Sequence, residues 1–209
     1  FKEDGTETQQ AKGQRNYDAP NPQGLAEFMK TGWEPSPLLN IQPAASNPYT
    51  TERRKKLSQS YPGIRLVIPA GPAKVRSNDT HYKFRAHTEF TYYTGILASE
   101  VVPDSVLILE PTSNGHEAIL FVHPRSPRDN EEFYRNAKYG EFWIGRRMTL
   151  EETESIYGLK VIHIEKLQEF LSKSAETLFV RNEHSDVDKK CKMSEEAEKD
   201  FSTYLSEVR

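Results

Sequence analysis

Cysteine is almost absent from the sequence, which has a single one, Cys191, in 209 residues. One cysteine excludes internal disulfides and clusters of thiolate metal ligands. It lies in the lysine-rich stretch DKKCKMS, where neighbouring positive charge is expected to lower the pKa of the thiol. A catalytic thiol also needs a positioned base, and none is identifiable nearby, so we interpret Cys191 as incidental.

Long apolar runs and an excess of positive charge are missing as well. No run of about 18 apolar residues occurs, which excludes a membrane-spanning helix. The N-terminus lacks the charged-then-apolar pattern of a signal peptide, so we expect a cytoplasmic protein. The net charge of -3 provides no general attraction for nucleic acid. We therefore expect neither a membrane nor a nucleic acid as partner.

Composition divides the chain into three parts. Residues 1–48 hold six of the thirteen prolines and begin with a polar run, which predicts an arm that is partly disordered. A short helix is expected near residues 22–31. Its apolar face, which docks either on the main body or on a partner, is formed by Leu25, Phe28, Met29 and Trp33. Residues 49–193 are predicted to form the main domain, and residues 194–209 a helix that leads into a further domain.

The main domain alternates strands with helices. Short apolar runs between turn residues predict buried strands at 64–69, 105–110, 117–123, 160–164 and 177–181, and Asn114–Gly115 predicts a hairpin. Helices are expected at 50–60, 129–140, 149–157, 165–174 and 194–209, and Thr149 and Glu152 have the spacing of a capping box. This order predicts an α/β fold in which helices flank a mixed β-sheet.

The stretch HYKFRAHTEFTYYTG, residues 81–95, concentrates histidines, charges and aromatic side chains. In an extended segment, Asp79, His81, His87 and Glu89 would all point to one side, as a metal site in an independent metallohydrolase would need. They would also be spread over about 20 Å, too far for one ion. The favoured interpretation is a polar sheet face. Base stacking by the aromatic residues is the less favoured alternative, because the chain is acidic.

Three segments resemble a known family. RSNDTHYKFRAHTEFTYYTG, VVPDSVLIL and YGEFWIGRRMTLEE are similar to the N-terminal domain of bacterial, actinobacterial-type Xaa-Pro aminopeptidases (aminopeptidase P), of the creatinase/prolidase "pita-bread" metallopeptidase family. The resemblance covers about residues 50–209. The matching positions are Arg76, Asp79, Tyr82, Phe84, Arg85, Glu89, Phe90, Tyr92, Thr94, Gly95, Trp143, Gly145, Arg146 and Arg147. The sequence departs from the family pattern before Pro103, because Glu100 lies three positions ahead of the proline instead of next to it.

This resemblance implies a ribonuclease-H-like mixed sheet and no catalytic or metal-binding residue in the chain itself. In the family, two metal ions, usually Mn(II), are held by a C-terminal catalytic domain, which we expect to begin after Arg209. The parent enzyme removes an N-terminal residue that precedes proline. This part alone is expected to be inactive, to restrict access to the active site and to contribute to homo-oligomer contacts. A stand-alone module that binds peptides or proteins is the alternative.

The resemblance also suggests site residues. Asp79 and Trp143 are expected near an active-site mouth, with Trp143 reaching the pocket of a neighbouring subunit. The competing interpretations are a turn cap or local arginine pair for Asp79 and core packing within a buried strand for Trp143. Arg85, Arg146 and Arg147 are expected to make contacts between domains rather than to bind substrate.

Overall fold

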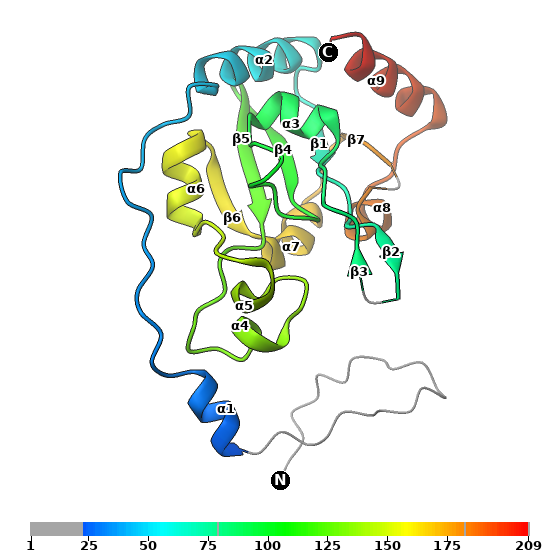
Figure 1. The fold of residues 1–209 in the computed structure, drawn as a ribbon. Helices are drawn as coiled ribbons and strands as arrows, with labels where there is room; N and C mark the ends of the chain where they lie inside the picture. Colours follow the sequence, from blue (N-terminus) through cyan, green and yellow to red (C-terminus); the bar gives the residue numbers. More distant parts are fainter. Residues whose placement is uncertain (1–22, 79, 182, 209) are drawn as a thin grey trace, which may run out of the picture.

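The computed structural model describes residues 23–208 with the exception of 79 and 182, and its centre is a five-stranded mixed sheet (Figure 1). The strands lie in the order β6-β5-β4-β1-β7. Strand β4 is antiparallel to β1 and β5, whereas β6 and β7 are parallel partners at the two edges. The predicted mixed α/β fold is confirmed. The strands are β1 (Arg65–Pro69), β4 (Val106–Thr112), β5 (Gly115–Val122), β6 (Lys160–His163) and β7 (Thr177–Phe179).

Helices cover both faces of this sheet, so its central strands are apolar on both sides. In β1, Leu66 and Ile68 belong to one buried cluster and Val67 to the other, as the alternation of side chains in a strand requires. Helices α2 (Asn47–Ser60), α3 (Thr88–Thr94), α6 (Leu150–Tyr157) and α9 (Glu195–Glu207) contribute to the first cluster. Helices α7 (Leu167–Leu171) and α8 (Ser185–Lys190) contribute to the second. In the part of the chain that the structure describes, no helix is long and apolar enough to cross a membrane.

Several local signals work as the sequence predicts. The Thr149 hydroxyl accepts from the backbone N–H of Glu152, whose carboxylate accepts from the backbone of Thr149, which completes the capping box of α6. The Ser194 hydroxyl accepts from the backbone N–H of Ala197 and so caps α9 without a reciprocal bond. The apolar stripe of α9 buries Phe201 and Leu205 against the first cluster, so this domain itself uses part of the stripe. The role of the helix as a lead-in to another domain stays a prediction.

The extended interpretation of residues 81–95 is wrong. After the short hairpin β2 (Val75–Ser77) and β3 (Thr80–His81), the chain enters a loop and then helix α3. Gly95, with a φ of 74°, ends α3 in the left-handed conformation that glycine adopts easily. The buried residues Phe90, Tyr93 and Thr94 follow helical spacing. The alternation argument for a row of ligands therefore does not apply.

Other elements also differ from expectation. The predicted helix at 129–140 is reduced to α4 (Glu132–Arg135). In the segment FWIG, the first three residues belong to α5 (Glu141–Ile144) instead of a strand, and Gly145 ends this helix. Helix α8 and the β2–β3 hairpin were not predicted. Helix α1 (Gln23–Met29) lies within the predicted range, although its expected start at residues 21 and 22 is outside the described residues.

Cys191 is buried, and this burial raises the pKa of its thiol. The expected lowering by neighbouring lysines is wrong, because Lys189, Lys190 and Lys192 do not contribute to the shift, while desolvation dominates it. A buried thiol with a raised pKa is a poor nucleophile.

Candidate functional site

A groove of about 610 Å³ lies beside the sheet, lined from the β2–β3 hairpin, the loop of residues 99–103 and the segment 137–148. Its volume is in the range of roughly 300–1,000 Å³ that is usual for ligand sites. Most of the lining is apolar, and Tyr157 donates a hydrogen bond to Glu100 at the edge. The main apolar and charged lining residues are Leu38, Tyr82, Phe84, Met148, Lys138 and Arg146.

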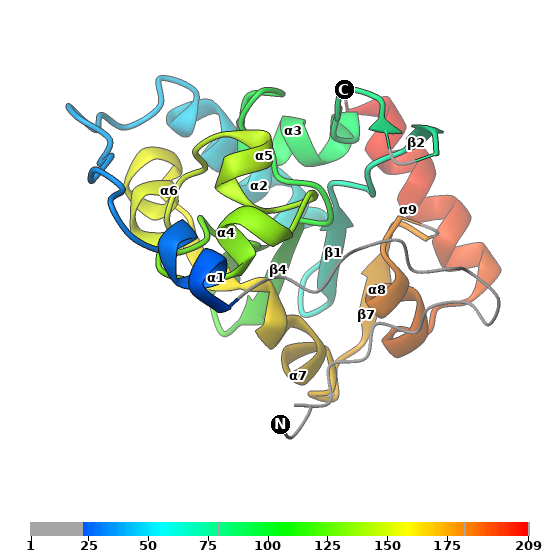
Figure 2. The same ribbon diagram turned by 60° about the horizontal axis from the view of Figure 1, so that its bottom comes forward.

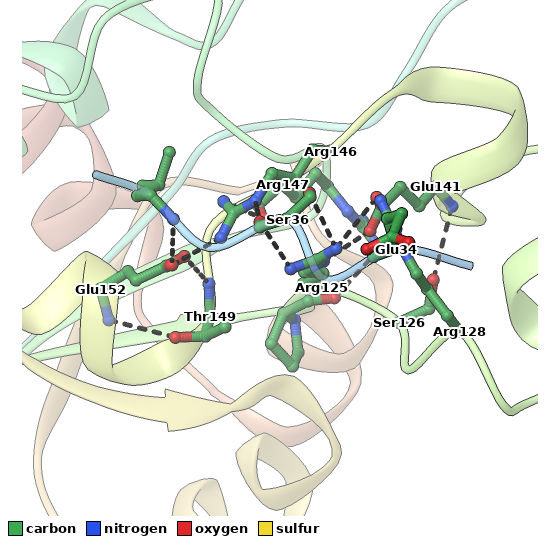
Figure 3. Close-up of polar contacts among 12 residues, drawn as sticks. Glu34, Ser36, Arg125, Ser126, Arg128, Glu141, Arg146, Arg147, Thr149 and Glu152 are labelled. Atoms are coloured by element: carbon green, nitrogen blue, oxygen red, sulfur yellow. Dashed lines mark hydrogen bonds and ion pairs between the residues drawn. The ribbon is translucent and has the colours of Figure 1, made fainter. Parts of the chain in front are cut away.

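One side of this groove is held together by the strap, which we define as residues 34–38. The Arg125 guanidinium donates to the Ser36 carbonyl at 3.1 Å and to its hydroxyl at 3.2 Å. Arg146 donates to the same carbonyl, and Arg128 donates to the carbonyl of Glu34. Figure 3 shows the three arginine side chains pointing toward the strap, with Arg125 and Arg146 at Ser36 and Arg128 at Glu34. The strap is therefore part of the folded domain.

Two glutamates form ion pairs with these three arginines. Glu141 lies 2.5 Å from Arg125 Nε and 2.6 Å from Arg128 Nη2, and Glu152 lies 2.5 Å from Arg146 Nη2 (Figure 3). Burial alone would raise the pKa of Glu141, but the hydrogen bonds from the two arginines outweigh it and hold the pKa below its usual 4.5. Burial also acts against ionisation of Glu152, yet Arg146 and backbone N–H groups keep its pKa below 4.5. Both carboxylates are therefore ionised at neutral pH.

These two carboxylates predict a loss of stability in acid. A carboxylate with a lowered pKa in the folded state stabilises the fold above its unfolded pKa, near 4.5, and this contribution is lost as the pH falls through the folded pKa. We expect the urea midpoint to decrease steadily below about pH 4.5. A Glu152→Gln variant lacks one of the two groups and should show a smaller decrease between neutral and acid pH. An equal decrease in both proteins would contradict the assignment.

Arg147 and Arg85 have different surroundings. Arg147 donates to the carbonyls of Pro124 and Tyr139 and lies 5.2 Å from the Tyr139 ring centre, and burial lowers its pKa. Arg85 is exposed and has no ion-pair partner among the residues that the structure describes. Arg146 and Arg147 make their contacts within this domain. For all three arginines, contacts with another domain stay a prediction.

Trp143 is on the surface. Its side chain is 58% exposed, so the interpretation as a core residue in a buried strand is wrong. The indole N–H donates to the Tyr134 carbonyl at 2.5 Å, which fixes the ring outside the core. Asp79 lies outside the described residues, so its predicted role is untested, as is the alternative of a turn cap or arginine pair.

The candidate metal ligands that the structure describes, His81, His87 and Glu89, do not form a site. His87 Nε2 lies 2.6 Å from Glu183 Oε2, while Glu89 belongs to the first turn of α3 and His81 to the groove. Across residues 23–208, leaving out 79 and 182, no group of three or more His, Cys, Asp or Glu side chains could hold a metal ion. The resemblance places the pair of metal ions of the family in a C-terminal domain, so we derive no step through a metal in this domain.

The sequence did not identify Arg125, Arg128 and Glu141 as site residues. Their contacts depend on the path of the strap across α5, and no local motif marks it. The sequence offered one indication of this cluster, because Arg125 and Arg128 each follow a proline. Such a pattern is too common to identify a site.

Comparison with known proteins identifies the fold and the family. The family profile "Aminopeptidase P, N-terminal domain" matches residues 50–180. Xaa-Pro aminopeptidase 1 of Streptomyces coelicolor is 38% identical over 188 residues, which are 88% of this chain and 37% of that protein. Xaa-Pro aminopeptidase 2 of the same organism is 36% identical over 88% of this chain and 39% of its own length. The chain thus spans less than two-fifths of these relatives.

A solved structure agrees with this result at the level of the fold. Aminopeptidase P from Escherichia coli in its low-pH form matches 69% of this chain and 31% of its own chain, with a TM-score of 0.53 and 24% identity. The fold observed here, a mixed sheet with flanking helices, is therefore consistent with the family that the profile identifies. The chain belongs to the aminopeptidase P N-terminal domain family.

Proposed function

We propose that this chain is the non-catalytic N-terminal domain of a longer Xaa-Pro aminopeptidase. The observation that carries the proposal is the identity of 36 to 38% with two Xaa-Pro aminopeptidases, of which the chain spans less than two-fifths. Among the described residues, no group of three or more His, Cys, Asp or Glu side chains could hold a metal ion of the kind that activates water in such enzymes. In the parent enzyme, a metal pair, manganese in our proposal, would be held by the catalytic domain.

The role of this domain in the proposal is to shape access to that catalytic centre. The groove and the loop after β3 form a wall with mixed apolar and cationic character, which suits an entrance for short peptides. The strap and its arginines give the wall a fixed shape, since they connect three separate segments. The domain would also supply contacts between copies of the parent enzyme.

Peptide hydrolysis tests the proposal directly. The chain of residues 1–209 and the product of the complete natural reading frame are purified and incubated with Mn²⁺ and an Xaa-Pro peptide. We expect release of the N-terminal residue by the longer protein and none by the 209-residue chain. A chelator should abolish the activity of the longer protein. Chelator-sensitive cleavage by the 209-residue chain, or a natural reading frame without a second domain, would overturn the proposal.

A further inference from the structure

A smaller pocket adjoins the groove, and we call it the basic pocket. It has a volume of about 220 Å³ and is lined by three cationic side chains, Lys74, Lys83 and Arg85, together with the rings of Tyr82 and Phe84. The same two rings also line the groove. A ligand that lies across Tyr82 and Phe84 can therefore occupy both cavities at once.

Positive charge is concentrated around the basic pocket, although the chain as a whole has a net charge of -3. Residues 70–88 contain four Lys and Arg residues, one Asp and no Glu. The four cationic side chains are exposed, and none of them forms an ion pair with a residue that the structure describes. They are Lys74, Arg76, Lys83 and Arg85. Cations without a partner in the fold can attract a ligand of opposite charge.

The cations of the groove, by contrast, already have partners. Lys138 pairs with Asp104 at 2.5 Å, and Arg146 pairs with Glu152 at 2.5 Å. Arg147 donates to two backbone carbonyls. The groove thus offers mainly apolar contacts to a ligand, whereas the basic pocket offers free positive charge.

The backbone of the basic pocket is held in place by the fold itself. The N–H of Tyr82 donates to the Lys74 carbonyl at 3.0 Å and so joins the two ends of the hairpin of β2 and β3. The N–H of His87 donates to the Ala70 carbonyl at 3.0 Å. His87 Nε2 also lies 2.6 Å from Glu183 Oε2, so this carboxylate is already engaged. The cationic side chains therefore extend from a preformed site, which lowers the cost of ordering on binding.

The size and charge of the basic pocket indicate the class of ligand. Its volume is below the roughly 300–1,000 Å³ of a typical small-molecule site, so it suits acidic side chains better than a whole ligand. A nucleic acid needs a longer basic stripe, and outside residues 70–88 the chain has an excess of acidic residues. An acidic peptide fits both cavities, because its carboxylates can meet the lysines while its apolar residues enter the groove.

The direction of a bound peptide follows from the reaction, and this step rests on the proposed function. An aminopeptidase holds the first residue of its substrate at the catalytic centre, so the residues after the proline extend toward the entrance. We propose that the basic pocket binds acidic side chains that follow the proline, and that the parent enzyme therefore favours acidic Xaa-Pro peptides. Lys74 and Lys83 bind the carboxylates, and neither takes part in cleavage of the peptide bond.

Nuclear magnetic resonance titration of the 209-residue chain tests this inference without any peptidase activity. The probes are the peptide Ala-Pro-Glu-Glu-Ala and its neutral counterpart Ala-Pro-Gln-Gln-Ala. At low salt we expect the acidic peptide to bind with a Kd about tenfold lower, and to shift the amide signals of residues 74–87. The difference should shrink as the ionic strength rises, because the ion pairs are exposed.

Two double variants locate the binding site. Lys74→Gln with Lys83→Gln should raise the Kd of the acidic peptide about tenfold and leave that of the neutral peptide unchanged. Lys55→Gln with Lys56→Gln is the matched control, because both lysines are exposed on α2 and have no ion-pair partner among the described residues. Figure 1 and Figure 2 both show α2 apart from the hairpin of β2 and β3. The control should bind the acidic peptide as the unchanged chain does.

Three results would overturn the inference. They are equal Kd values for the two peptides, a loss in the first double variant no larger than in the control, and tighter binding of a single-stranded oligonucleotide than of the acidic peptide. The last result would make nucleic acid the ligand.

Hydrolysis by the longer protein separates this inference from the proposed function. Its kcat/KM should be about tenfold higher for the acidic peptide than for the neutral one, and the first double variant should remove this advantage. An inactive longer protein whose 209-residue part still prefers the acidic peptide would refute the proposed activity alone. An active longer protein whose 209-residue part binds both peptides equally would refute the basic pocket alone.

Discussion

Glu141→Gln should lower the free energy of unfolding by about 3 kcal/mol, because it removes the only carboxylate that Arg125 and Arg128 share among the residues that the structure describes. The Glu141 side chain is 7% exposed, and its two arginine partners, which donate to the strap, are 15% and 24% exposed. Glutamine keeps the shape of the side chain but not its charge, so two guanidinium groups would be left without compensation. Urea unfolding monitored by tryptophan fluorescence measures the change.

Glu131→Gln provides the control for this prediction. Glu131 also pairs with an arginine, Arg135, but both side chains are nearly half exposed and lie one turn apart on the surface. Such pairs contribute about 0.5 kcal/mol or less. Equal effects of the two substitutions would show that Glu141 does not hold the arginines of the strap in the way described here.

The sheet could be predicted from the sequence because its strands are short apolar runs with turn residues at both ends. The hairpin expected at Asn114–Gly115 joins β4 and β5, although its turn is formed by Ser113 and Asn114, one residue earlier than predicted, and Gly115 already pairs with Thr112. From there the register runs to Val106 with Phe121. The capping box of α6 could be predicted for a similar reason, since all its determinants lie within four residues.

Short apolar segments were the main source of error. Four residues such as FWIG have no readable period, so a buried strand and one exposed helical turn are equally compatible with them. Burial decided the outcome: Glu141 of α5 points to the arginines, while Phe142, Trp143 and Ile144 remain exposed. The helical conformation of α5 is therefore determined by its tertiary contacts and not by the local propensity of its residues.

The contacts between the strap and its arginines were the part of the structure that the sequence predicted least. The strap is bound mainly through its backbone carbonyls, at Glu34 and Ser36, and carbonyl groups are the same in every residue. No side-chain pattern can therefore mark such a contact in advance. Arg146 was singled out by its resemblance to a family motif, but its local partners, Ser36 and Glu152, became visible only in the fold.

Phe90→Ala should destabilise the domain by about 3–5 kcal/mol, because the Phe90 ring is completely buried and its removal leaves a cavity under α3. Tyr93→Ala should be similarly severe, since Tyr93 lies one helical turn further along the same buried face. Tyr92→Ala, by contrast, should cost less, because Tyr92 is only partly buried at the margin of the first cluster and its ring centre lies 4.1 Å from the Arg53 guanidinium. A strand would reverse this order, because residues 90 and 92 would then share a face and residue 93 would point away. Chemical unfolding of the three variants therefore decides between the two geometries, and a Tyr92→Ala loss as large as that of Tyr93→Ala would contradict the helix.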